Sequence, residues 1–591
     1  MAQLGERGTP DISIRIGGPA GAGIKAAGQS LARTFMREGL WTMDLTEYPS
    51  LIRGGHNVIT VRVGPKPFFS HAVDVDILIA LDRLTVEKDG PSLVEGGAVV
   101  YDPASVEAAT LPSHARGVPV QLDEIAKRNG GVIMRNTVAM AAALALLRFP
   151  LEPFESALHA QFDSKSAEVA EGNVRAAREG HAEAWKHADD FPLRLSPVPG
   201  APERVLVDGN DAVCLGALAA GIGFYAAYPM TPASTLLHYM ARHEGDGVVV
   251  KHVEDEIAAM NMVVGAAFTG ARAMCATSGG GFSLMAEAFG LAGVTESAVV
   301  VGVFSRPGPA TGMPTWTEQG DLQFVIHAAQ GEFPRVVLAP GDRDDAFHLT
   351  WQAFNLADRL QTPVVLLGDS YLSDNRQSVL PFETARVTID RGETITEGEV
   401  SDYLRYRDTP DGISPRAIPG VKGAEQLVNS YEHDEYGWGQ EGERAEVRVQ
   451  QDEKRMRKME LARTLAPAPV AFGPLEADVS IVSFGSTKGP IRDAMDELAA
   501  EGVSANFLQV VTCWPFPARE VSGFLAVAKR SLVVENNYTG QLEQLIRQEC
   551  LMEPDDRLHR YDGRAFTYAQ IAEKAREMVR RPARELTGVT R

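Results

Sequence analysis

The amino-acid sequence predicts an α/β protein built of three α/β domains. Three observations support this fold class. Short apolar runs alternate with helical patterns in three separate blocks, a proline-rich joint lies at 191–205, and a polar, turn-rich stretch lies at 395–465. Alternation of strands and helices favours sheets that are mostly parallel. The two interruptions divide the chain, which at 591 residues is too long for one hydrophobic core.

The first block, which ends near residue 190, alternates strand and helix patterns and predicts a mostly parallel sheet. Its strand patterns are ISIRI at 12–16, VITVRV at 58–63, VDILIAL at 75–81 and GAVVYD at 97–102. Its helical patterns lie at 26–39 and 137–149, and the first of them stops at a glycine, as helices often do.

A glycine-rich loop lies between the first strand and the first helix. Gly21, Gly23 and Ala26 satisfy a relaxed G-x-G-x-x-A dinucleotide fingerprint, and Asp44 lies about 20 residues further on. Backbone amides at a helix N-terminus attract phosphate, so nucleotide binding is one interpretation. The other interpretation is a tight turn that lets the helix pack closely on the strand.

The second block, from about 205 to 385, has the same alternation, and its connections are rich in Gly, Pro, Ser and Thr. Its expected strands are FYAAYP, AMCATS, AVVVGVF, RVVLAP and PVVLLGD, and its expected helices lie at 232–242, 254–269, 282–294 and 343–358. In open α/β sheets, ligands bind at the carboxyl ends of the strands.

The phrase YPMTPAST follows the first strand of this block. Local physics predicts Thr231 as an N-cap residue and Pro232 at the first helical position. A second interpretation is that the hydroxyl of Thr231 and the helix N-terminus bind an anionic group.

Glu256 is the third of three acids at the start of the expected helix 254–269, which is otherwise almost wholly apolar. Its helical neighbours Ala259, Met260, Val263 and Ala267 are apolar, so the face that carries Glu256 leads into a dry interior. A buried carboxyl is a good proton partner for a ligand nitrogen. Thiamine diphosphate enzymes use such a glutamate on the aminopyrimidine ring, and the stretch from Glu256 to Gly265 resembles their pyrimidine-binding domains.

The magnesium and diphosphate half of a thiamine site is not expected in this chain. Gly-Asp-Gly stands at 245–247, but no asparagine follows at the required distance, and EGDGVVV has the composition of a turn between a helix and a strand. The sequence therefore predicts half of a thiamine site, with the diphosphate half on another subunit.

The rest of the chain is a long connection and a third block. Residues 395–465 are polar and charged and are expected to end in a charged helix. From 477 onward the alternation returns, with strands in ADVSIVSFG, SANFLQVV and RSLVVEN. Most residues of this third block, including VVENNYTGQLEQL, are expected to have a scaffold role.

Composition excludes several classes of function. A formal net charge of −21 repels phosphate backbones and anionic lipids, so neither nucleic acid nor a membrane is an expected partner. The chain lacks a long apolar stretch and its N-terminus lacks a signal-peptide core, which predicts a cytoplasmic protein. The four cysteines are far apart with no C-x-x-C, so neither an iron-sulfur cluster nor another metal site is expected in this chain.

Several motifs resemble the α subunit of 2-oxoacid:ferredoxin oxidoreductases with a γ module fused at its N-terminus. They are YPMTPAST, EDEIAAMNMVVGAAFTGARAMCATSGGGFSLMAEA, RPGPATGMPTWTEQGDL, DGISPRAIPG with EHDEYG, and GSTKGPIRDAM with GQLEQLIRQE. TEYPSLIRGGHNVITVRV resembles the γ module. The resemblance covers nearly the whole chain.

The resemblance implies a domain plan of a γ module, a thiamine-diphosphate pyrimidine-binding domain and a transketolase C-terminal-like domain. The corresponding boundaries are 1–195, 203–385, 386–470 for the connecting segment, and 471–591. The implied reaction converts a 2-oxoacid, coenzyme A and oxidised ferredoxin into acyl-CoA, carbon dioxide and reduced ferredoxin. A β subunit would hold the diphosphate, Mg²⁺ and a [4Fe-4S] cluster, in a dimer of αβ pairs.

The resemblance also implies site residues. Glu256 would be catalytic, and Thr231 would contact the substrate carboxylate. Relatives often carry Lys or Arg where this chain has Trp316, so either Arg306 or the β subunit would supply the substrate's cation. The cofactor-binding set would be Tyr228, Pro229, Thr231, Glu256, Thr277, Ser278 and Gly279. Arg53, Gly54 and Gly55 would form an anion-facing loop near coenzyme A.

The substrate expected from the fused γ module, from RYRDTPDGISPRAIPG and from WTEQGDL is 2-oxoglutarate, with succinyl-CoA as product. Pyruvate, branched-chain and mixed 2-oxoacids are alternatives. Two other classes stay open: a stand-alone nucleotide-dependent dehydrogenase and a non-catalytic scaffold subunit.

Overall fold

The chain folds into two compact units. The computed structural model describes residues 11–51, 54–162 and 166–581. Unit 1 is Met1–Val207 with Asn375–Pro381, and unit 2 is Asp208–Asp374 with Phe382–Arg591. The chain therefore passes from one unit to the other three times. Both units combine helices with parallel strands, which confirms the predicted α/β class.

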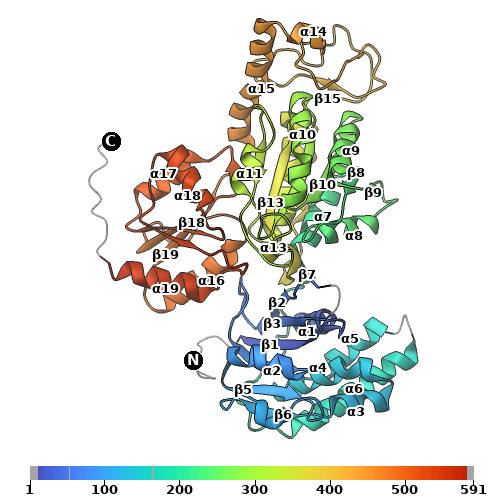
Figure 1. Ribbon diagram of the computed structural model, residues 1–591, viewed down its shortest axis with the longest axis vertical. Coiled ribbons are helices and arrows are strands. Elements are labelled where there is room, and N and C mark those ends of the chain that lie inside the picture. Colours follow the sequence, from blue (N-terminus) through green and yellow to red (C-terminus); the bar gives the residue numbers. More distant parts are fainter. Residues whose placement is uncertain (1–10, 52–53, 163–165, 582–591) are drawn as a thin grey trace. The chain divides into compact units, whose positions relative to one another are not determined.

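Unit 1 is built on one eight-stranded sheet (Figure 1). Its strands, in spatial order, are β6 (Arg116–Pro119), β5 (Leu93–Tyr101), β4 (Val75–Ala80), β1 (Ile12–Pro19), β3 (His56–Gly64), β2 (Trp41–Glu47), β14 (Gln377–Val379) and β7 (Val205–Val207). Its helices are α1 (Ile24–Arg37), α2 (Arg83–Asp89), α3 (Leu122–Asn129), α4 (Arg135–Leu146), α5 (Glu152–Phe162) and α6 (Ala167–Trp185).

The prediction of a mostly parallel sheet is right for only half of unit 1. Strands β6, β5, β4 and β1 are parallel, whereas β3, β2, β14 and β7 each pair antiparallel with the strand before them in the sheet. The reason is that β2 and β3 follow each other without a helix between them, and a short connection joins antiparallel strands.

Unit 2 has a seven-stranded main sheet. Its strands, in spatial order, are β20 (Thr512–Trp514), β12 (Val336–Leu338), β13 (Val364–Asp369), β11 (Val299–Ser305), β10 (Ala273–Thr277), β8 (Phe224–Ala227) and β9 (Val249–His252). Only β20 runs antiparallel to its neighbour among these described strands. All the strands and helices expected between 224 and 369 are present, with shifted ends.

Helices cover both faces of this sheet. They are α7 (Gly209–Ala219), α8 (Ser234–Ala241), α9 (Glu256–Phe268), α10 (Gly279–Val294), α11 (Leu322–His327), α12 (Arg343–Leu360) and α13 (Ser370–Asp374). Ala273 and Cys275 of β10 pack into one core with α9 and α10, whereas Met274 and Ala276 pack into another with α7, α8 and α12. Residues of a strand alternate between two faces, so both faces are buried, as in parallel sheets generally.

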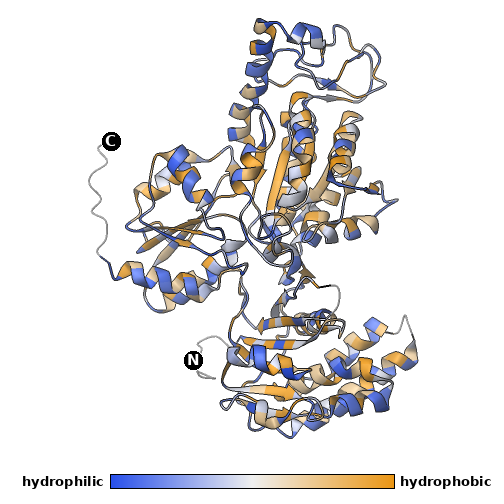
Figure 2. Cartoon of the chain, in the orientation of Figure 1, coloured by the Kyte–Doolittle hydropathy of each residue, from blue (hydrophilic) through white to orange (hydrophobic). Residues whose placement is uncertain are grey.

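The connecting segment is long and ends in a charged helix, as the sequence predicted. It holds the short strands β15 (Thr394–Ile395) and β16 (Arg416–Ala417), the short helix α14 (Gly439–Gly442) and the helix α15 (Ala445–Leu465). Figure 2 shows that hydrophilic residues dominate α15.

Helix α15 is held by a buried ionic cluster. Lys454 and Lys458 are 0% and 1% exposed, and they bond Glu296 at 2.6 and 2.5 Å. Arg405 donates to the backbone oxygen of Glu296 at 2.9 Å. The carboxylate thus pairs with two lysines, and burial of these charges is tolerable because they are paired.

The third block forms a five-stranded sheet within unit 2. Its strands, in spatial order, are β17 (Val470–Phe472), β19 (Ala505–Gln509), β18 (Val479–Ser483), β21 (Ser531–Glu535) and β22 (Asp556–His559). Its helices are α16 (Lys488–Ala500), α17 (Ala518–Ala526), α18 (Gln541–Leu545) and α19 (Tyr568–Val579). Within the described residues, no helix has both the length and the apolar character needed to cross a membrane.

Candidate functional site

The candidate site lies at the carboxyl ends of β8, β10 and β11, three neighbouring parallel strands of unit 2. The segment Tyr228–Thr231 follows β8, Ser278 follows β10, and Arg306 follows β11. Because these strands end at one edge of the sheet, residues far apart in sequence meet there.

Glu256 lies in the interior of this site. Asp255 is the N-cap of α9 and accepts a hydrogen bond from the backbone nitrogen of Ala258, which leaves the side chain of Glu256 available for another role. Glu256 is 2% exposed, and the Thr277 hydroxyl lies 3.5 Å from its Oε1. The same hydroxyl lies 3.7 Å from the sulfur of Met230. The start of α9, the end of β10 and the segment after β8 therefore meet at the Thr277 hydroxyl.

The first turn of α10 packs closely against that carboxylate, which the absence of a side chain at Gly281 allows. A Cβ at Gly281 would lie 2.0 Å from the Thr277 Oγ1 and 2.5 Å from the Glu256 Oε1. Ser278, the N-cap of α10, is 1% exposed, makes no capping hydrogen bond, and its hydroxyl has no hydrogen-bond partner among the described residues. A buried carboxylate, an unpartnered buried hydroxyl and a glycine cradle form a donor and acceptor set that fits a flat heterocycle such as the aminopyrimidine of thiamine diphosphate.

The expected N-cap role of Thr231 is wrong. Helix α8 begins at Ser234 with Ala233 as its N-cap, three residues after Thr231. Pro232 lies before the helix, and its carbonyl accepts a hydrogen bond from the Asn210 side chain at 2.9 Å. Capping therefore does not account for the Thr231 hydroxyl.

The structure brings Thr231 and Arg306 together. Arg306 Nη1 donates to the backbone oxygen of Thr231 at 2.7 Å. Burial lowers the pKa of Arg306, and nearby Asp321 acts in the opposite direction. A guanidinium has five N–H donors, so this bond leaves donors of Arg306 for an anion.

Two carboxyl groups missed by the sequence analysis accompany Arg306. Burial raises the pKa of Asp321, while Ser305 and Arg306 lower it. Its carboxylate lies over the start of α10, since a Cβ at Gly279 would meet both oxygens at 2.5 Å. Burial, with help from Asp321, raises the pKa of Glu318 to about 7. Both carboxyl groups belong to the phrase TEQGDL, which supported the family resemblance and the substrate expectation but was not examined for site residues.

A second cation lies beside Trp316. The guanidinium carbon of Arg564 stands 3.1 Å from the centre of the Trp316 ring. The two segments are joined further, because the Thr317 nitrogen donates to the Gly563 oxygen at 3.2 Å. The sequence did not predict this contact, because Arg564 belongs to the third block and lies far from Trp316 in the chain.

The third block also supports the loop after β11. Gln319 donates its backbone hydrogen to the Asn536 oxygen at 2.7 Å, and the Asn536 nitrogen donates back to Gln319 Oε1 at 2.9 Å. Gln541 donates to the Gly320 oxygen at 2.7 Å. The turn 536–541 therefore holds the loop that carries Glu318 and Asp321.

In unit 1 the glycine loop is a tight turn between β1 and α1. Gly21 and Gly23 have φ of 84° and 74°, which favours glycine. The neighbours of β1 are β3, which is antiparallel, and β4, so β2 is not the adjacent parallel strand of a dinucleotide-binding unit. Asp44 Oδ1 accepts a hydrogen bond from the Arg376 nitrogen at 2.9 Å, which ties it to β14.

The anion-facing loop is described only in part. Arg53 lies outside the described residues. Gly54 and Gly55 have φ of 76° and 95°, and the Gly55 oxygen accepts a hydrogen bond from the Ala20 nitrogen of the glycine loop at 3.1 Å. These two glycines therefore lie beside the turn between β1 and α1.

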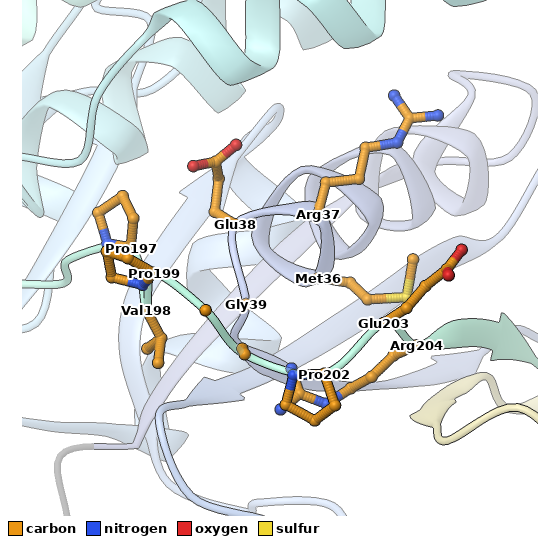
Figure 3. Close-up of a pocket in the computed structure, with 12 residues that line it drawn as sticks. Met36, Arg37, Glu38, Gly39, Pro197, Val198, Pro199, Pro202, Glu203 and Arg204 are labelled. Carbon is orange, nitrogen blue, oxygen red and sulfur yellow. The ribbon is translucent and has the colours of Figure 1, made fainter.

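Unit 1 also contains an open cleft of about 510 Å³ (Figure 3). The end of α1, from Met36 to Gly39, forms one wall, and the proline-rich joint from Pro197 to Arg204 forms the other. None of the residues predicted from sequence to be functional lines it.

Three family models match the chain. Residues 13–183 match pyruvate ferredoxin/flavodoxin oxidoreductase, and residues 215–454 match the thiamine diphosphate-binding domain of pyruvate flavodoxin/ferredoxin oxidoreductase. Residues 477–571 match core domain II of pyruvate:ferredoxin oxidoreductase.

Relatives match along almost the whole length. The α subunit of 2-oxoacid:ferredoxin oxidoreductase 2 from Aeropyrum pernix is 34% identical over 95% of this chain and 97% of its own. The 2-oxoglutarate synthase subunit KorA from Archaeoglobus fulgidus is 35% identical over 59% of this chain and 92% of its own. The solved 2-oxoglutarate:ferredoxin oxidoreductase from Magnetococcus marinus, with 2-oxoglutarate, coenzyme A and succinyl-CoA bound, is 31% identical. It covers 96% of this chain and 100% of its own, with a TM-score of 0.91.

Proposed function

Because the chain belongs to the 2-oxoacid:ferredoxin oxidoreductases, as a relative of their α subunits with a thiamine diphosphate-binding domain, we propose that its substrate is 2-oxoglutarate. The products would be succinyl-CoA, carbon dioxide and reduced ferredoxin. The names of the Archaeoglobus relative and of the Magnetococcus structure support this choice. Pyruvate, branched-chain and mixed 2-oxoacids are the competing substrates.

The observation that carries the proposed thiamine-dependent reaction is the buried carboxylate of Glu256, with Thr277 beside it and Gly281 facing it. Glu256 would exchange a proton with the aminopyrimidine nitrogen at its Oε1, and the Thr277 hydroxyl would orient that oxygen. The side of Glu256 toward α9 is apolar and excludes water, which strengthens a hydrogen bond to the ring. Thiamine diphosphate, when bound, supplies the nucleophilic carbon that adds to the keto carbon and accepts the electron pair left by carbon dioxide.

Other residues around Glu256 complete the proposed cofactor site. The Ser278 hydroxyl is free to bond the ring, and Gly279 starts the helix beside it. Tyr228 and Pro229 follow β8 and would border the ring, with Tyr228 39% exposed and 6.5 Å from the His252 ring. A carboxylate, a hydroxyl and an aromatic edge suit a heterocycle that carries both nitrogen donors and acceptors.

Thr231 and Arg306 are proposed to hold the substrate carboxylate. The hydrogen bond from Arg306 to the backbone oxygen of Thr231 holds the guanidinium beside this residue. An arginine in a partly buried place binds a carboxylate strongly because the charge-assisted bond is poorly screened there. Arg564, stacked on Trp316, is a second cation for the distal carboxylate of a dicarboxylic 2-oxoacid.

The remaining parts of the reaction are proposed to come from a β subunit that holds the diphosphate, Mg²⁺ and a [4Fe-4S] cluster, in a dimer of αβ pairs. Ferredoxin would accept the electrons. Coenzyme A would approach the loop of Gly54 and Gly55 in unit 1. The cytoplasm is the proposed compartment.

The proposal is tested on the native complex, purified with its partner subunit. Coenzyme A-dependent reduction of a low-potential acceptor is measured with 2-oxoglutarate, pyruvate and a branched-chain 2-oxoacid. A kcat/KM highest for 2-oxoglutarate is expected, and a preference for another acid would reassign the substrate.

A variant separates catalysis from scaffolding. Glu256→Gln keeps the size of the side chain and is expected to abolish turnover in the assembled complex. Full activity of that variant would mean a non-catalytic subunit or a different site. Hydride transfer to a nicotinamide by the chain without a partner would instead indicate a stand-alone dehydrogenase.

A further inference from the structure

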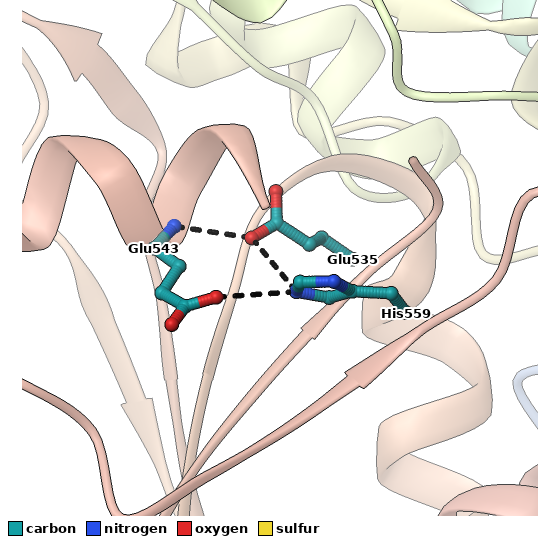
Figure 4. A group of neighbouring side chains, drawn as sticks. All are labelled: Glu535, Glu543 and His559. Atoms are coloured by element: carbon teal, nitrogen blue, oxygen red, sulfur yellow. Dashed lines mark hydrogen bonds and ion pairs between the residues drawn. The ribbon is translucent and has the colours of Figure 1, made fainter. Parts of the chain in front are cut away.

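Three potential metal ligands meet in the third block of unit 2 (Figure 4). Glu535 ends β21, Glu543 lies in α18, and His559 ends β22. One ligand atom from each lies within 4.8 Å of the other two. The chain spacing between them is long, which is why a search for closely spaced ligands in the sequence predicted no metal site.

The distances in this cluster are too long for hydrogen bonds and suit ligands around an ion. His559 Nε2 lies 3.7 Å from Glu535 Oε1 and 3.5 Å from Glu543 Oε2. That nitrogen is buried, and no hydrogen bond to it exists among the described residues. Two bonds of about 2.1 Å that meet at the tetrahedral angle place their ligand atoms about 3.4 Å apart.

Glu535 is a buried carboxylate whose hydrogen-bond partners are neutral. It is 0% exposed, and it accepts hydrogen bonds from the backbone nitrogens of Leu542 and Glu543 and from the Asn537 amide. Buried charges in proteins are normally paired with a cation or bind a metal. Among the described residues, the potential cation paired with Glu535 is His559, at 3.7 Å from Oε1, so a cation bound between them would compensate this buried charge.

A glycine opens the space between the three side chains. Gly540 has φ of 71°, and a Cβ there would lie 2.7 Å from Glu543 Oε2 and 2.8 Å from the His559 Cε1. A side chain at this position would fill the space that an ion and its bound water require.

We propose that Glu535, Glu543 and His559 bind one divalent transition-metal ion of the zinc or manganese class. Two carboxylates and one imidazole are a donor set that such ions favour, and water would complete the coordination. Arg547 and Arg557 both bond Glu543 Oε1, and Arg557 also lies 3.5 Å from Oε2, the oxygen that faces His559. The two guanidinium charges weaken the attraction for a dication, so the ion exchanges with solution rather than being held permanently.

The ion would stabilise the turn 536–541, which supports the candidate active site. The cluster closes the turn 536–541, and that turn bonds Gln319 and Gly320 of the loop with Glu318 and Asp321. A metal bound to residues from β21, α18 and β22 fixes the ends of the turn relative to each other. The ion is therefore structural and separate from the proposed reaction.

The test uses the untagged full chain and Zn²⁺ or Mn²⁺ alone as the probe. Equilibrium dialysis with elemental analysis is expected to give about one ion per chain. X-ray absorption of the zinc-loaded chain is expected to show only oxygen and nitrogen at about 2.0–2.2 Å, since a sulfur at about 2.3 Å would indicate binding at a cysteine. Addition of the metal is expected to raise the midpoint of thermal unfolding by several degrees.

Variants locate the ion. His559→Gln and Glu543→Gln are expected to lower the affinity at least tenfold and to remove the thermal shift. His243→Gln is the matched control, because His243 pairs with a single carboxylate, Asp246, at 3.1 Å in an exposed turn. Circular dichroism verifies that each variant folds. If His559→Gln does not fold, Glu543→Gln alone locates the ion.

Three results would overturn the proposal. They are the absence of a stoichiometric ion at saturating free metal, an unchanged affinity in both cluster variants, and a sulfur shell in the absorption spectrum. In each case the cluster would be an ion-pair network around His559.

Discussion

Replacement of Gly281 by alanine tests the geometry of the candidate site with a single methyl group. The new Cβ would lie 2.0 Å from Thr277 Oγ1 and 2.5 Å from Glu256 Oε1. Both distances are shorter than an ordinary van der Waals contact, which begins near 3.4 Å. Both groups are enclosed by α9, β10 and α10, so relief requires a shift of the carboxylate or of the helix start by about an ångström. Overpacking of this kind costs about 1–3 kcal/mol, and an ångström of misplacement in a reacting group costs about a hundredfold in rate.

Gly280→Ala is the matched control for that variant. Its Cβ would meet only the Ala310 oxygen at 3.7 Å, in ordinary contact, on the same turn of α10. Alanine is the better helix former, so this change is expected to stabilise the chain by up to about 1 kcal/mol. The two substitutions are chemically identical and differ only in what the methyl group meets.

The assays are denaturant unfolding of the chain and, in the assembled complex, turnover and the requirement for thiamine diphosphate. Gly281→Ala is expected to lower turnover by about a hundredfold and to weaken cofactor binding, while Gly280→Ala retains both. Turnover and cofactor affinity of Gly281→Ala within twofold of the control would refute the arrangement of Glu256 and Thr277 around the cofactor.

Three further predictions concern the substrate site and the buried cluster under α15. Thr231→Ala is expected to raise the KM for the 2-oxoacid about tenfold while unfolding changes by less than about 0.5 kcal/mol, since Thr231 caps no helix. Glu296→Gln leaves Lys454 and Lys458 buried without a counter-charge and is expected to cost about 3–5 kcal/mol in urea unfolding, whereas Lys458→Met costs less because Lys454 remains paired. Burial lowers the pKa of Lys458 to about 7 from 10.5, so the unfolded chain binds more protons between those pH values and the free energy of unfolding rises with pH there. The slope, at most about 1.4 kcal/mol per pH unit, is expected to vanish in Lys458→Met; an unchanged slope would contradict the assignment.

Local patterns in the sequence predicted most of the fold. The valine-rich runs became the central strands of the main sheet, because such runs suit strands buried on both faces. Glu256 was predicted to be buried near the start of its helix because its apolar neighbours at helical spacing are visible in the sequence, and the structure places it, 2% exposed, as the first residue of α9. Its role in catalysis stays a prediction, as do the other site residues and the segment boundaries.

Long-range contacts could not be predicted in the same way. Arg564 reaches Trp316, and Asn536 reaches Gln319, across more than 200 positions of sequence, so no local pattern marks either contact. A helix cap was one of the two interpretations of Thr231, because TP before a helical pattern satisfies the local rule for an N-cap. The hydrogen bond from Asn210 to the Pro232 carbonyl joins residues 22 positions apart, so a rule based on neighbouring residues does not include it.

Strand β14 affects how the nascent protein folds on the ribosome. It is the only described strand that joins β7 to β2 in the sheet of unit 1, yet it is translated after all of Asp208–Asp374. At about 5–20 residues per second, the N-terminal portion waits on the order of ten to thirty seconds with the side of β2 unpaired. An unpaired edge recruits other strands, so this interval is when a newly made chain most needs a chaperone.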